Sequence, residues 1–321
     1  MEITLRNVKQ WARLGPRGVF GLAILDVAAN YPDMMVMSAD LASSSGLERF
    51  KNTYPNQFLN AGIAEQNMIG VASGLAKEGF NVFASSFSPF IAMRASEQVR
   101  MNLGYMHMNV KAVAIGSGIG MGFLGNSHFG LEDVSVMRAI PGLTIVNPAD
   151  CAEVVKTIKA AAEFKGPMYI RLTGTANSPI VYEDEYEFTI GKSITLRQGS
   201  DVTLIACGSM VYEALQAANM LSEQGIEAEV VNMHTIKPLD TTSVDNAIAS
   251  GKPIITIEEH TTLGGLGSSV AEYMSPLERR VRHLLIGLPD AYIKTGDYQY
   301  MLKDQQLDAE SLAVRIKAFV G

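Results

Sequence analysis

From residue 20 onward, short runs of apolar and β-branched residues alternate with longer segments in which apolar residues recur at helical spacing. The first series predicts strands in MMVMS, NVFAS, VKAVAIGS, LTIVN and MYIRL, and helices over 64–78, 89–103 and 149–164. The second series predicts strands in DVTLIAC, EAEVVNM, PIITIEEH and HLLIGLP, and helices over 211–224, 241–250, 268–274 and 309–320. Such alternation is typical of βαβ units in a mostly parallel sheet, so we predict an α/β fold.

The two series are separated by an acidic stretch without helical period, VYEDEYEFTIGKSITLRQGS. We therefore predict two α/β domains, over 1–180 and 200–321, joined by a linker over 181–199. The length of 321 residues agrees with this division, because domains usually contain about 100–200 residues.

The composition limits the class of protein. Apolar residues make up 47% of the chain and charged residues 18%, so we expect apolar surface to be covered in an oligomer. The net charge of −7, without any Lys/Arg-rich run, argues against nucleic-acid binding. The N-terminus lacks the apolar core of a signal peptide, and no segment approaches the ~18 uninterrupted apolar residues of a membrane span. We expect a cytoplasmic protein without membrane contact, in which Cys151 and Cys207 are buried and unpaired.

Candidate functional residues follow the predicted strands. Ligands of open α/β sheets bind beyond the carboxyl ends of the strands. Asp40 and Leu41 follow the first strand, Glu65 opens a helix after QFLNA, and Phe87 follows NVFAS. The next strand runs into a glycine-rich segment, residues 116–128, which we call the glycine loop.

The glycine loop contains one nominal G-x-G-x-x-G match, at Gly120, Gly122 and Gly125. A dinucleotide fingerprint turns straight into a helix and is followed by an acid at the end of the next strand, about 20 residues on. Here Asn126-Ser127-His128 intervenes and the next strand ends in Asn147, so we favour a loop whose backbone approaches another ligand. The sequence contains no G-x-x-x-x-G-K-[ST] phosphate loop and no G-x-S-x-G motif.

The combination of GIAEQNM, SSFSPF, a glycine loop ending in His128 and GLEDVSVMRAIPGLTIVNPAD resembles the pyrimidine-binding domain of the transketolase family. TIKPLD, EEH and GGLGSSVAE resemble the C-terminal domain of the same family, so the resemblance covers essentially the whole chain. It implies a parallel-sheet pyrimidine-binding domain of the thiamine-diphosphate fold, followed by a transketolase C-terminal-like α/β domain. Within the superfamily the chain looks most like the second subunit of split transketolases, in which two genes encode the enzyme.

The resemblance implies thiamine diphosphate as cofactor, with Mg²⁺ bound to the diphosphate. In this family a GDG motif and a later Asn supply the metal ligands. The only Gly-Asp pair in this sequence, Gly296-Asp297, is followed by Tyr298 and lies near the C-terminus. We therefore expect no metal ligand in this chain and a partner subunit that carries GDG…N, in an α2β2 heterotetramer.

The resemblance also implies roles for individual residues. Glu65 matches the Glu that hydrogen-bonds a pyrimidine ring nitrogen of the cofactor, and His128 matches a His near the donor oxygens that can move a proton. Phe87 and Phe90 match aromatics that contact the pyrimidine ring, and Met93 stands where transketolases often have Tyr. The small residues of the helix after Glu65 suggest an interface helix.

Further matches concern the SADL segment and the substrate. Asp40 and Leu41 match residues beside the cofactor. Arg17, Ser44 and Arg171 fall where the family holds a sugar phosphate, so we expect a small phosphorylated or otherwise anionic sugar substrate.

The sequence departs from the family pattern in the glycine loop. Transketolases have an acidic residue and a second His there, whereas this chain has Leu124 and Gly116. Leu124 cannot accept a hydrogen bond from a ketose hydroxyl, so we predict a modified sugar phosphate, a sulfonated or branched sugar, or a 2-keto acid as donor, rather than the standard pentose phosphates.

The resemblance implies a carboligase that moves a two-carbon unit to an aldose acceptor, with the cofactor supplying the carbon–carbon chemistry. Two alternatives remain at this point: the β subunit of a 2-keto acid dehydrogenase, and a non-catalytic assembly subunit that retains the fold. A nicotinamide-dependent oxidoreductase is the weakest hypothesis.

Overall fold

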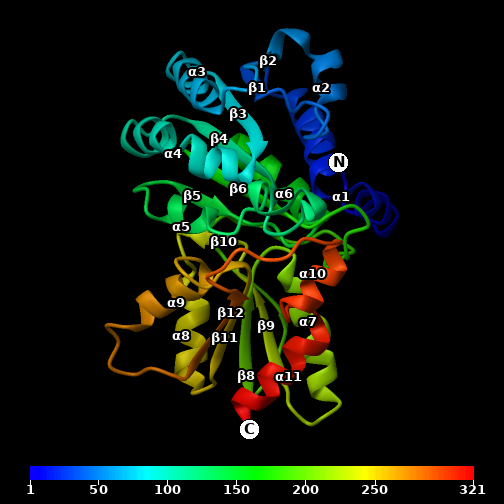
Figure 1. Cartoon of the computed structure of the whole chain (residues 1–321), viewed down its shortest axis with the longest axis vertical. Coiled ribbons are helices and arrows are strands. Elements are labelled where there is room, and N and C mark those ends of the chain that lie inside the picture. Colours follow the sequence, from blue (N-terminus) through cyan, green and yellow to red (C-terminus); the bar gives the residue numbers. More distant parts are fainter.

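The computed structural model describes residues 1–321, and the chain forms two sheets, one in each half of the molecule in Figure 1. The first sheet has seven strands, in the order β10 (Thr235–Lys237), β5 (Thr144–Val146), β6 (Met168–Thr173), β4 (Val110–Ser117), β3 (Asn81–Phe87), β1 (Met34–Ser38) and β2 (Phe58–Asn60). The second has five strands, in the order β12 (His283–Leu288), β11 (Ile254–Thr261), β8 (Val202–Ala206), β9 (Ala228–Asn232) and β7 (Ile194–Arg197). Neighbouring strands are parallel except at the β10–β5 and β7–β9 pairs, which confirms two α/β domains with mostly parallel sheets.

Helices cover both faces of the first sheet. Successive residues of a strand point to opposite faces, so Phe83 and Ala84 of β3 belong to two different core clusters. The cluster around Phe83 is completed by α1 (Leu5–Ala28) and α6 (Cys151–Glu163), and the cluster around Ala84 by α3 (Glu65–Lys77) and α5 (Asp133–Arg138). The short α2 (Glu48–Thr53) and η1 (Pro55–Gln57) connect β1 to β2.

Helix α1 was not predicted from the sequence. It buries Val8, Trp11 and Val19, but it is broken at Gly15, where φ is +76°, and Pro16 begins the second part. A side chain at Gly15 would also meet the Thr175 carbonyl oxygen at 2.7 Å. The break interrupts the helical period of apolar residues, which explains why the pattern was missed.

The segment predicted as one helix over 89–103 consists of two π-helical segments, η2 (Phe90–Arg94) and η3 (Val99–Tyr105), on either side of the short α4 (Ser96–Gln98). The N–H of Ala95 bonds to the carbonyl of Phe90 at 3.1 Å, which is the five-residue spacing of a π turn. Such turns occur frequently at functional sites, and this one carries Phe90 and Arg94.

Strand β7 lies inside the range 181–199 predicted as linker, because Ile194–Arg197 pairs with β9 in the second sheet. Earlier in the same range, the N–H groups of Val181 and Tyr182 bond to the carboxylate of Asp150, which caps α6. Both ends of the predicted linker are therefore attached to a domain. Strand β10 follows β9 directly but joins the first sheet, beside β5.

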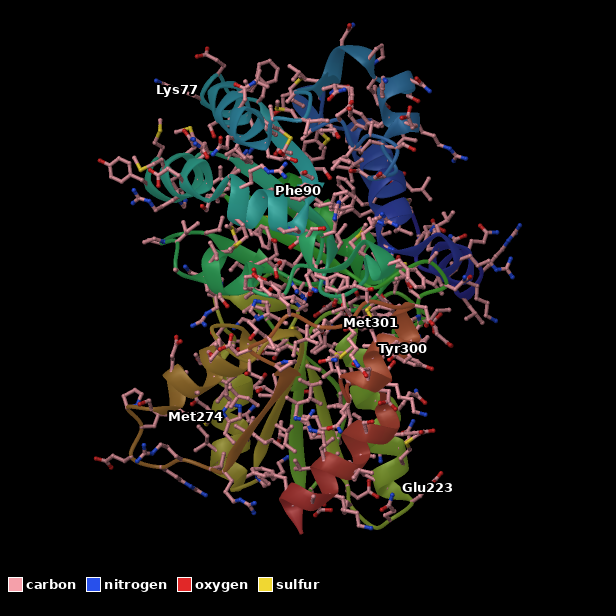
Figure 2. The ribbon with its side chains drawn as sticks, viewed as in Figure 1. Lys77, Phe90, Glu223, Met274, Tyr300 and Met301 are labelled. Atoms are coloured by element: carbon pink, nitrogen blue, oxygen red, sulfur yellow. The ribbon has the colours of Figure 1, made fainter.

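The second sheet is also covered on both faces, by α7 (Met210–Ser222) with α11 (Ala309–Val320) and by α8 (Thr241–Ser250) with α9 (Leu266–Met274). Helix α10 (Tyr298–Asp304) lies at the boundary between the domains, where Figure 2 labels Tyr300 and Met301.

The carboxyl ends of strands from both sheets meet at this boundary. The N–H of Ser209, after β8, bonds to Thr173 of β6, and the N–H of Ile119, after β4, bonds to Glu259 of β11. Each core cluster contains residues of both domains, so the domains share their cores.

None of the helices combines the length and the hydropathy that crossing a bilayer requires. Cys151 and Cys207 are free and buried, as predicted, and burial raises the pKa of both thiols to about 12.

Candidate active site

Glu65 is the first residue of α3, and its side chain is only 1% exposed. Ser86 Oγ donates a hydrogen bond of 3.0 Å to Oε1, and Arg94 Nη1 lies 2.8 Å from Oε2. The helix N-terminus favours a carboxylate here, and the ion pair offsets the cost of burying its charge. The immediate partners of this buried carboxylate are therefore polar.

Phe87, Phe90 and His128 form a cluster of three rings. Phe87 ends β3, Phe90 begins η2 and His128 follows η4 (Gly122–Ser127). The ring centroids lie 5.8 Å apart for Phe87–Phe90, 5.5 Å for Phe87–His128 and 5.3 Å for Phe90–His128, all in edge-to-face arrangements. The structure thus brings the two phenylalanines of SSFSPF together with His128, which ends the glycine loop.

Arg94 joins the aromatic cluster to Glu65. Its guanidinium carbon lies 4.0 Å from the centroid of the Phe90 ring while Nη1 contacts the carboxylate of Glu65. Arg94 was not among the residues predicted from the sequence. The sequence does contain a signal for Arg94, because it is the single cation in the apolar run FIAMRA and lies one helical turn after Phe90.

Asp40 and Leu41 lie in the turn after β1. Asp40 is exposed and adopts a φ of +58°, and its N–H donates to Asn60 Oδ1 at 2.9 Å. The same Asn60 oxygen accepts the N–H of Gly62 at 3.0 Å. Asn60, another residue missed from sequence, therefore fixes the turn after β1 to the turn that leads into Glu65. Leu41 is half-buried, and its N–H bonds to Ser38 Oγ.

Arg17 and Ser44 come from segments whose backbones touch. Gly46 packs so closely on α1 that an added side chain would meet the Arg17 carbonyl oxygen at 2.8 Å. Both side chains are half-buried, and Arg17 forms no ion pair with a carboxylate of this chain. Burial lowers the pKa of Arg17. A guanidinium without a carboxylate partner suits an anionic ligand.

The position of Arg171 does not support the predicted phosphate contact. Arg171 is fully buried, and its Nε lies 2.9 Å from Asp133 Oδ2. Its Nη2 donates to the carbonyl oxygens of Gly130 and Glu259, at 2.9 Å each. Nε and Nη2 are therefore occupied by partners inside the protein, and one of these partners, Asp133, is the first residue of α5.

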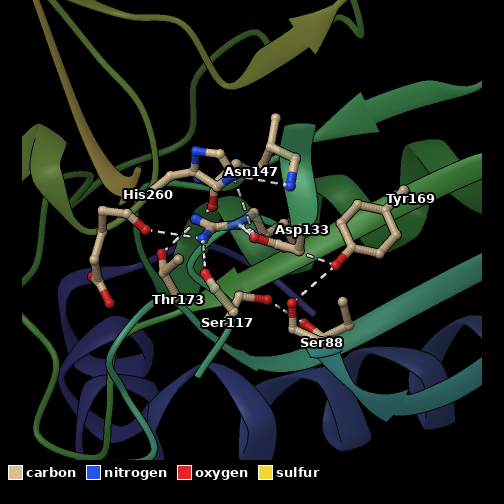
Figure 3. A network of polar contacts seen from close by, with 12 residues as sticks. Ser88, Ser117, Asp133, Asn147, Tyr169, Thr173 and His260 are labelled. Atoms are coloured by element: carbon tan, nitrogen blue, oxygen red, sulfur yellow. Dashed lines mark hydrogen bonds and ion pairs between the residues drawn. The ribbon is translucent and has the colours of Figure 1, made fainter. Parts of the chain in front are cut away.

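Figure 3 shows the network around this pair. Tyr169 donates to Asp133 at 2.7 Å, and its hydroxyl also lies 3.0 Å from Ser88 Oγ, next to Phe87. Burial opposes the charge on Asp133, but Arg171 and His260 hold the pKa of Asp133 below its usual value. Burial lowers the pKa of His260 to about 4, so this ring is neutral.

The remaining predicted residues lie in η2 and the glycine loop. Met93 and Leu124 are exposed and lie outside the aromatic cluster. Gly116 is buried, and a side chain there would meet Met121 Sδ at 2.3 Å and Phe87 Cδ1 at 3.4 Å. The loop continues into a 3-10 turn rather than an α-helix, which agrees with our rejection of a dinucleotide fingerprint.

Comparison with protein families identifies the two domains. Residues 14–177 match the transketolase pyrimidine-binding domain, and residues 191–312 match the transketolase C-terminal domain. The chain belongs to the transketolase family. The second match begins at residue 191, so it includes strand β7. This agrees with the place of β7 in the second sheet.

Several curated relatives of this transketolase-family chain are named as a subunit or as a C-terminal section of a transketolase. A putative transketolase C-terminal section of Methanocaldococcus jannaschii is 42% identical over 94% of this chain and 95% of its own length. A subunit of the apulose-4-phosphate transketolase of Phocaeicola vulgatus is 38% identical over 95% of this chain and 97% of its own length. A 6-deoxy-6-sulfo-D-fructose transketolase subunit of a Clostridium species is 38% identical over 90% and 89%.

Solved structures agree with the assignment. A structure described as a split-gene transketolase, inactive β4 tetramer, superposes with a TM-score of 0.86 at 37% identity, over 95% of this chain and 98% of that one. Transketolase of Campylobacter jejuni superposes with a TM-score of 0.79 at 22% identity, and this chain covers 46% of it. This second likeness concerns the fold.

The family implies thiamine diphosphate, and the described residues fit part of that cofactor. A buried carboxylate at Glu65, joined through Arg94 to the Phe90 ring that packs on Phe87, suits an aminopyrimidine, which offers ring nitrogens and a flat face. Nowhere in residues 1–321 do three or more His, Cys, Asp or Glu side chains gather in a way that could hold a metal ion.

Proposed function

We propose that this chain is the pyrimidine-binding subunit of a split, thiamine-diphosphate-dependent transketolase that is active only with a partner subunit. The observation that supports this best is the buried Glu65 carboxylate, which Arg94 links to the Phe90 ring, and this ring in turn contacts Phe87 and His128. The absence of a GDG motif supports a partner that holds the diphosphate and Mg²⁺. An α2β2 heterotetramer is the assembly we propose.

The bound cofactor would supply the carbon–carbon bond chemistry of a two-carbon transfer. Glu65 would hold a proton between its carboxyl group and a pyrimidine nitrogen, since each of its oxygens has only one partner in this chain. Phe87 and Phe90 would orient the ring and exclude water. His128 would donate a proton to the oxygen of the donor sugar, or accept one from it.

We propose an anionic, modified sugar as donor. Arg17 and Ser44 offer a cation and a hydroxyl, whereas the exposed Leu124 offers no acceptor to a donor hydroxyl. Two of the relatives are named for sugars that carry a phosphate or a sulfo group, which supports the same class.

The test is reconstitution with the chain of roughly 270–300 residues and GDG…N motif that we expect from a neighbouring gene, a length that rests on ordinary domain size. The mixture should bind thiamine diphosphate and turn over phosphorylated or sulfonated ketoses, and neither chain alone should do so. Glu65→Gln should lower kcat by at least about 100-fold. The exposed Glu97→Gln is the matched control.

Full activity of this chain alone would contradict the proposal, and so would full activity of the Glu65→Gln complex, which would favour an assembly subunit. High activity with xylulose 5-phosphate and ribose 5-phosphate would contradict the modified donor only. Mass photometry of the mixture tests the heterotetramer.

A further inference from the structure

The glycine loop is held by groups that lie outside it, and most of them come from the second domain. Oε1 of Glu259, in β11, accepts the N–H of Ile119 at 2.7 Å. The contact is so close that a side chain at Gly118, where φ is +66°, would lie 2.1 Å from the same oxygen. Glu259 is fully buried, and its Oε2 accepts hydrogen bonds from Tyr298 and Ser209. This carboxylate therefore has a fixed position.

A second anchor lies at the far side of the loop. Asn126 Nδ2 donates to the carbonyl of Ile293 at 2.9 Å, and the N–H of Ile293 donates back to Asn126 Oδ1 at 3.2 Å. The segment after β12 that contains Ile293 continues over the loop, since a side chain at Gly125 would meet Thr295 Cγ2 at 2.7 Å. A reciprocal pair of bonds fixes orientation as well as distance.

A third anchor closes the base of the loop. Gly118 and Gly130 exchange two backbone hydrogen bonds, of 3.1 and 3.0 Å. Arg171 Nη2 donates both to the carbonyl of Gly130 and to the carbonyl of Glu259, so one guanidinium ties the loop base to β11. Residue 128 lies between the second and third anchors.

We infer that the C-terminal domain acts at the active site as a clamp on the glycine loop, and that Glu259, Asn126 and Arg171 are positioning residues for His128 and for the donor. The inference rests on the proposed function and deepens it. None of the three side chains needs to touch the substrate. They hold the segment that carries His128 against Phe87 and Phe90, and that presents Leu124 outward. Donor discrimination thus depends in part on the second domain, through Glu259 and the backbone of Ile293.

Hydrogen–deuterium exchange of the full chain tests the clamp without any turnover. Peptides from residues 116–128 should exchange about tenfold faster or more in Glu259→Ala and in Asn126→Ala, because a buried hydrogen bond to a charged or amide group is lost. Peptides from α3 and α11 should be unchanged. Glu259→Gln keeps an acceptor for Ile119 and should exchange like wild type.

Glu229→Ala is the matched control, because Glu229 also accepts hydrogen bonds inside the second domain, from Thr203 and Lys252, but at the amino end of β9. If Glu259→Ala does not fold, the Asn126→Ala variant alone tests the clamp. The Asn126 side chain is only partly buried, so its removal should not prevent folding. Unchanged exchange of the loop in Asn126→Ala, or equal acceleration in Glu229→Ala, would overturn the inference.

Kinetics of the reconstituted complex give the second readout. A looser loop should raise KM for the donor by about five- to tenfold, with a smaller change of kcat, and Glu259→Gln should restore KM. A merely structural role would lower the amount of active enzyme and leave KM unchanged, which counts against the clamp. If no complex turns over any donor, the proposed function fails, while the exchange result still decides whether the loop is clamped.

Discussion

Arg94 lies nearly half exposed, yet it neutralises a carboxylate that water does not reach. We predict that Arg94→Met lowers the free energy of unfolding by about 1–3 kcal/mol, because Glu65 loses a charged hydrogen-bond partner and keeps only Ser86. Urea denaturation of the isolated chain measures the change.

Arg100→Met is the control for this prediction. Arg100 pairs with Glu97 three residues away, and both side chains are 60% exposed. Solvent screens a pair of this kind, so Arg100→Met should leave the free energy of unfolding essentially unchanged. Equal losses in the two variants would contradict the special status of the Arg94 contact.

Glu153 gives a prediction about pH. It is fully buried in α6, and burial raises its pKa to about 8. The native state therefore binds a proton that the unfolded chain releases above its ordinary pKa of about 4.3. The stabilising effect of this proton is complete at low pH and is lost as the pH rises through about 8.

We predict that Glu153→Gln flattens the fall in stability between pH 5 and about 8, because the amide carries no titrating proton. Melting temperatures across this range measure the slope. Glu163→Gln, at the exposed end of the same helix, should keep the wild-type slope.

At the scale of elements, α3 has an exposed face that includes Asn67, Gly70 and Gly74. A side chain added at either glycine would meet nothing within 4 Å in this chain. We predict that Gly70→Leu leaves the isolated chain folded, and stabilises it by up to about 1 kcal/mol through helix propensity, but weakens assembly.

Sedimentation or mass photometry of the reconstituted complex tests this interface role for α3. Glu310→Leu, which adds an apolar side chain to the exposed face of α11, is the control for general stickiness. An unchanged assembly in Gly70→Leu would show that α3 faces solvent in the complex.

The elements that the sequence predicted well are those with long, regular patterns. Strands such as VKAVAIGS and helices such as α6 were expected within a residue or two of their observed ends. Strands β7 and β10, of four and three residues, lie at sheet edges and carry too short a pattern to be recognised. The π turns at 90–105 keep an apolar period close to that of an α-helix, so they were predicted as one.

For the whole molecule, the buried pair of Arg171 and Asp133 lies where the two domains meet. We predict that Arg171→Met destabilises the chain by about 3–5 kcal/mol, because it leaves Asp133 charged and unpaired in the interior. The double variant with Asp133→Asn should recover part of this loss. Denaturant titrations of the single and double variants measure the free energy of unfolding. Equal stabilities of these two variants would contradict the explanation that an unpaired Asp133 causes the loss.

Some contacts of the site could be predicted from the sequence, and others could not, because they join the two domains. Glu65, Phe87, Phe90 and His128 could be brought together from sequence, because parallel strands place their carboxyl ends at one edge of a sheet. The contacts of Arg171 with Glu259, and of Asn126 with Ile293, join residues far apart in the sequence. They depend on how the second domain packs on the first, which no local pattern specifies.

Strand β10 has a consequence for how the protein is made. The free edge of β5 is capped only when Thr235–Lys237 arrives, after the chain has already passed through β7, β8 and β9. Between the synthesis of β6 and that of β10, more than fifty residues are added while the β5 edge of the first sheet is unpaired. Unpaired strand edges can pair with strands of other chains and so promote aggregation. A nascent chain halted shortly before residue 235 should be markedly more prone to aggregate on the ribosome than one halted just after the strand has emerged.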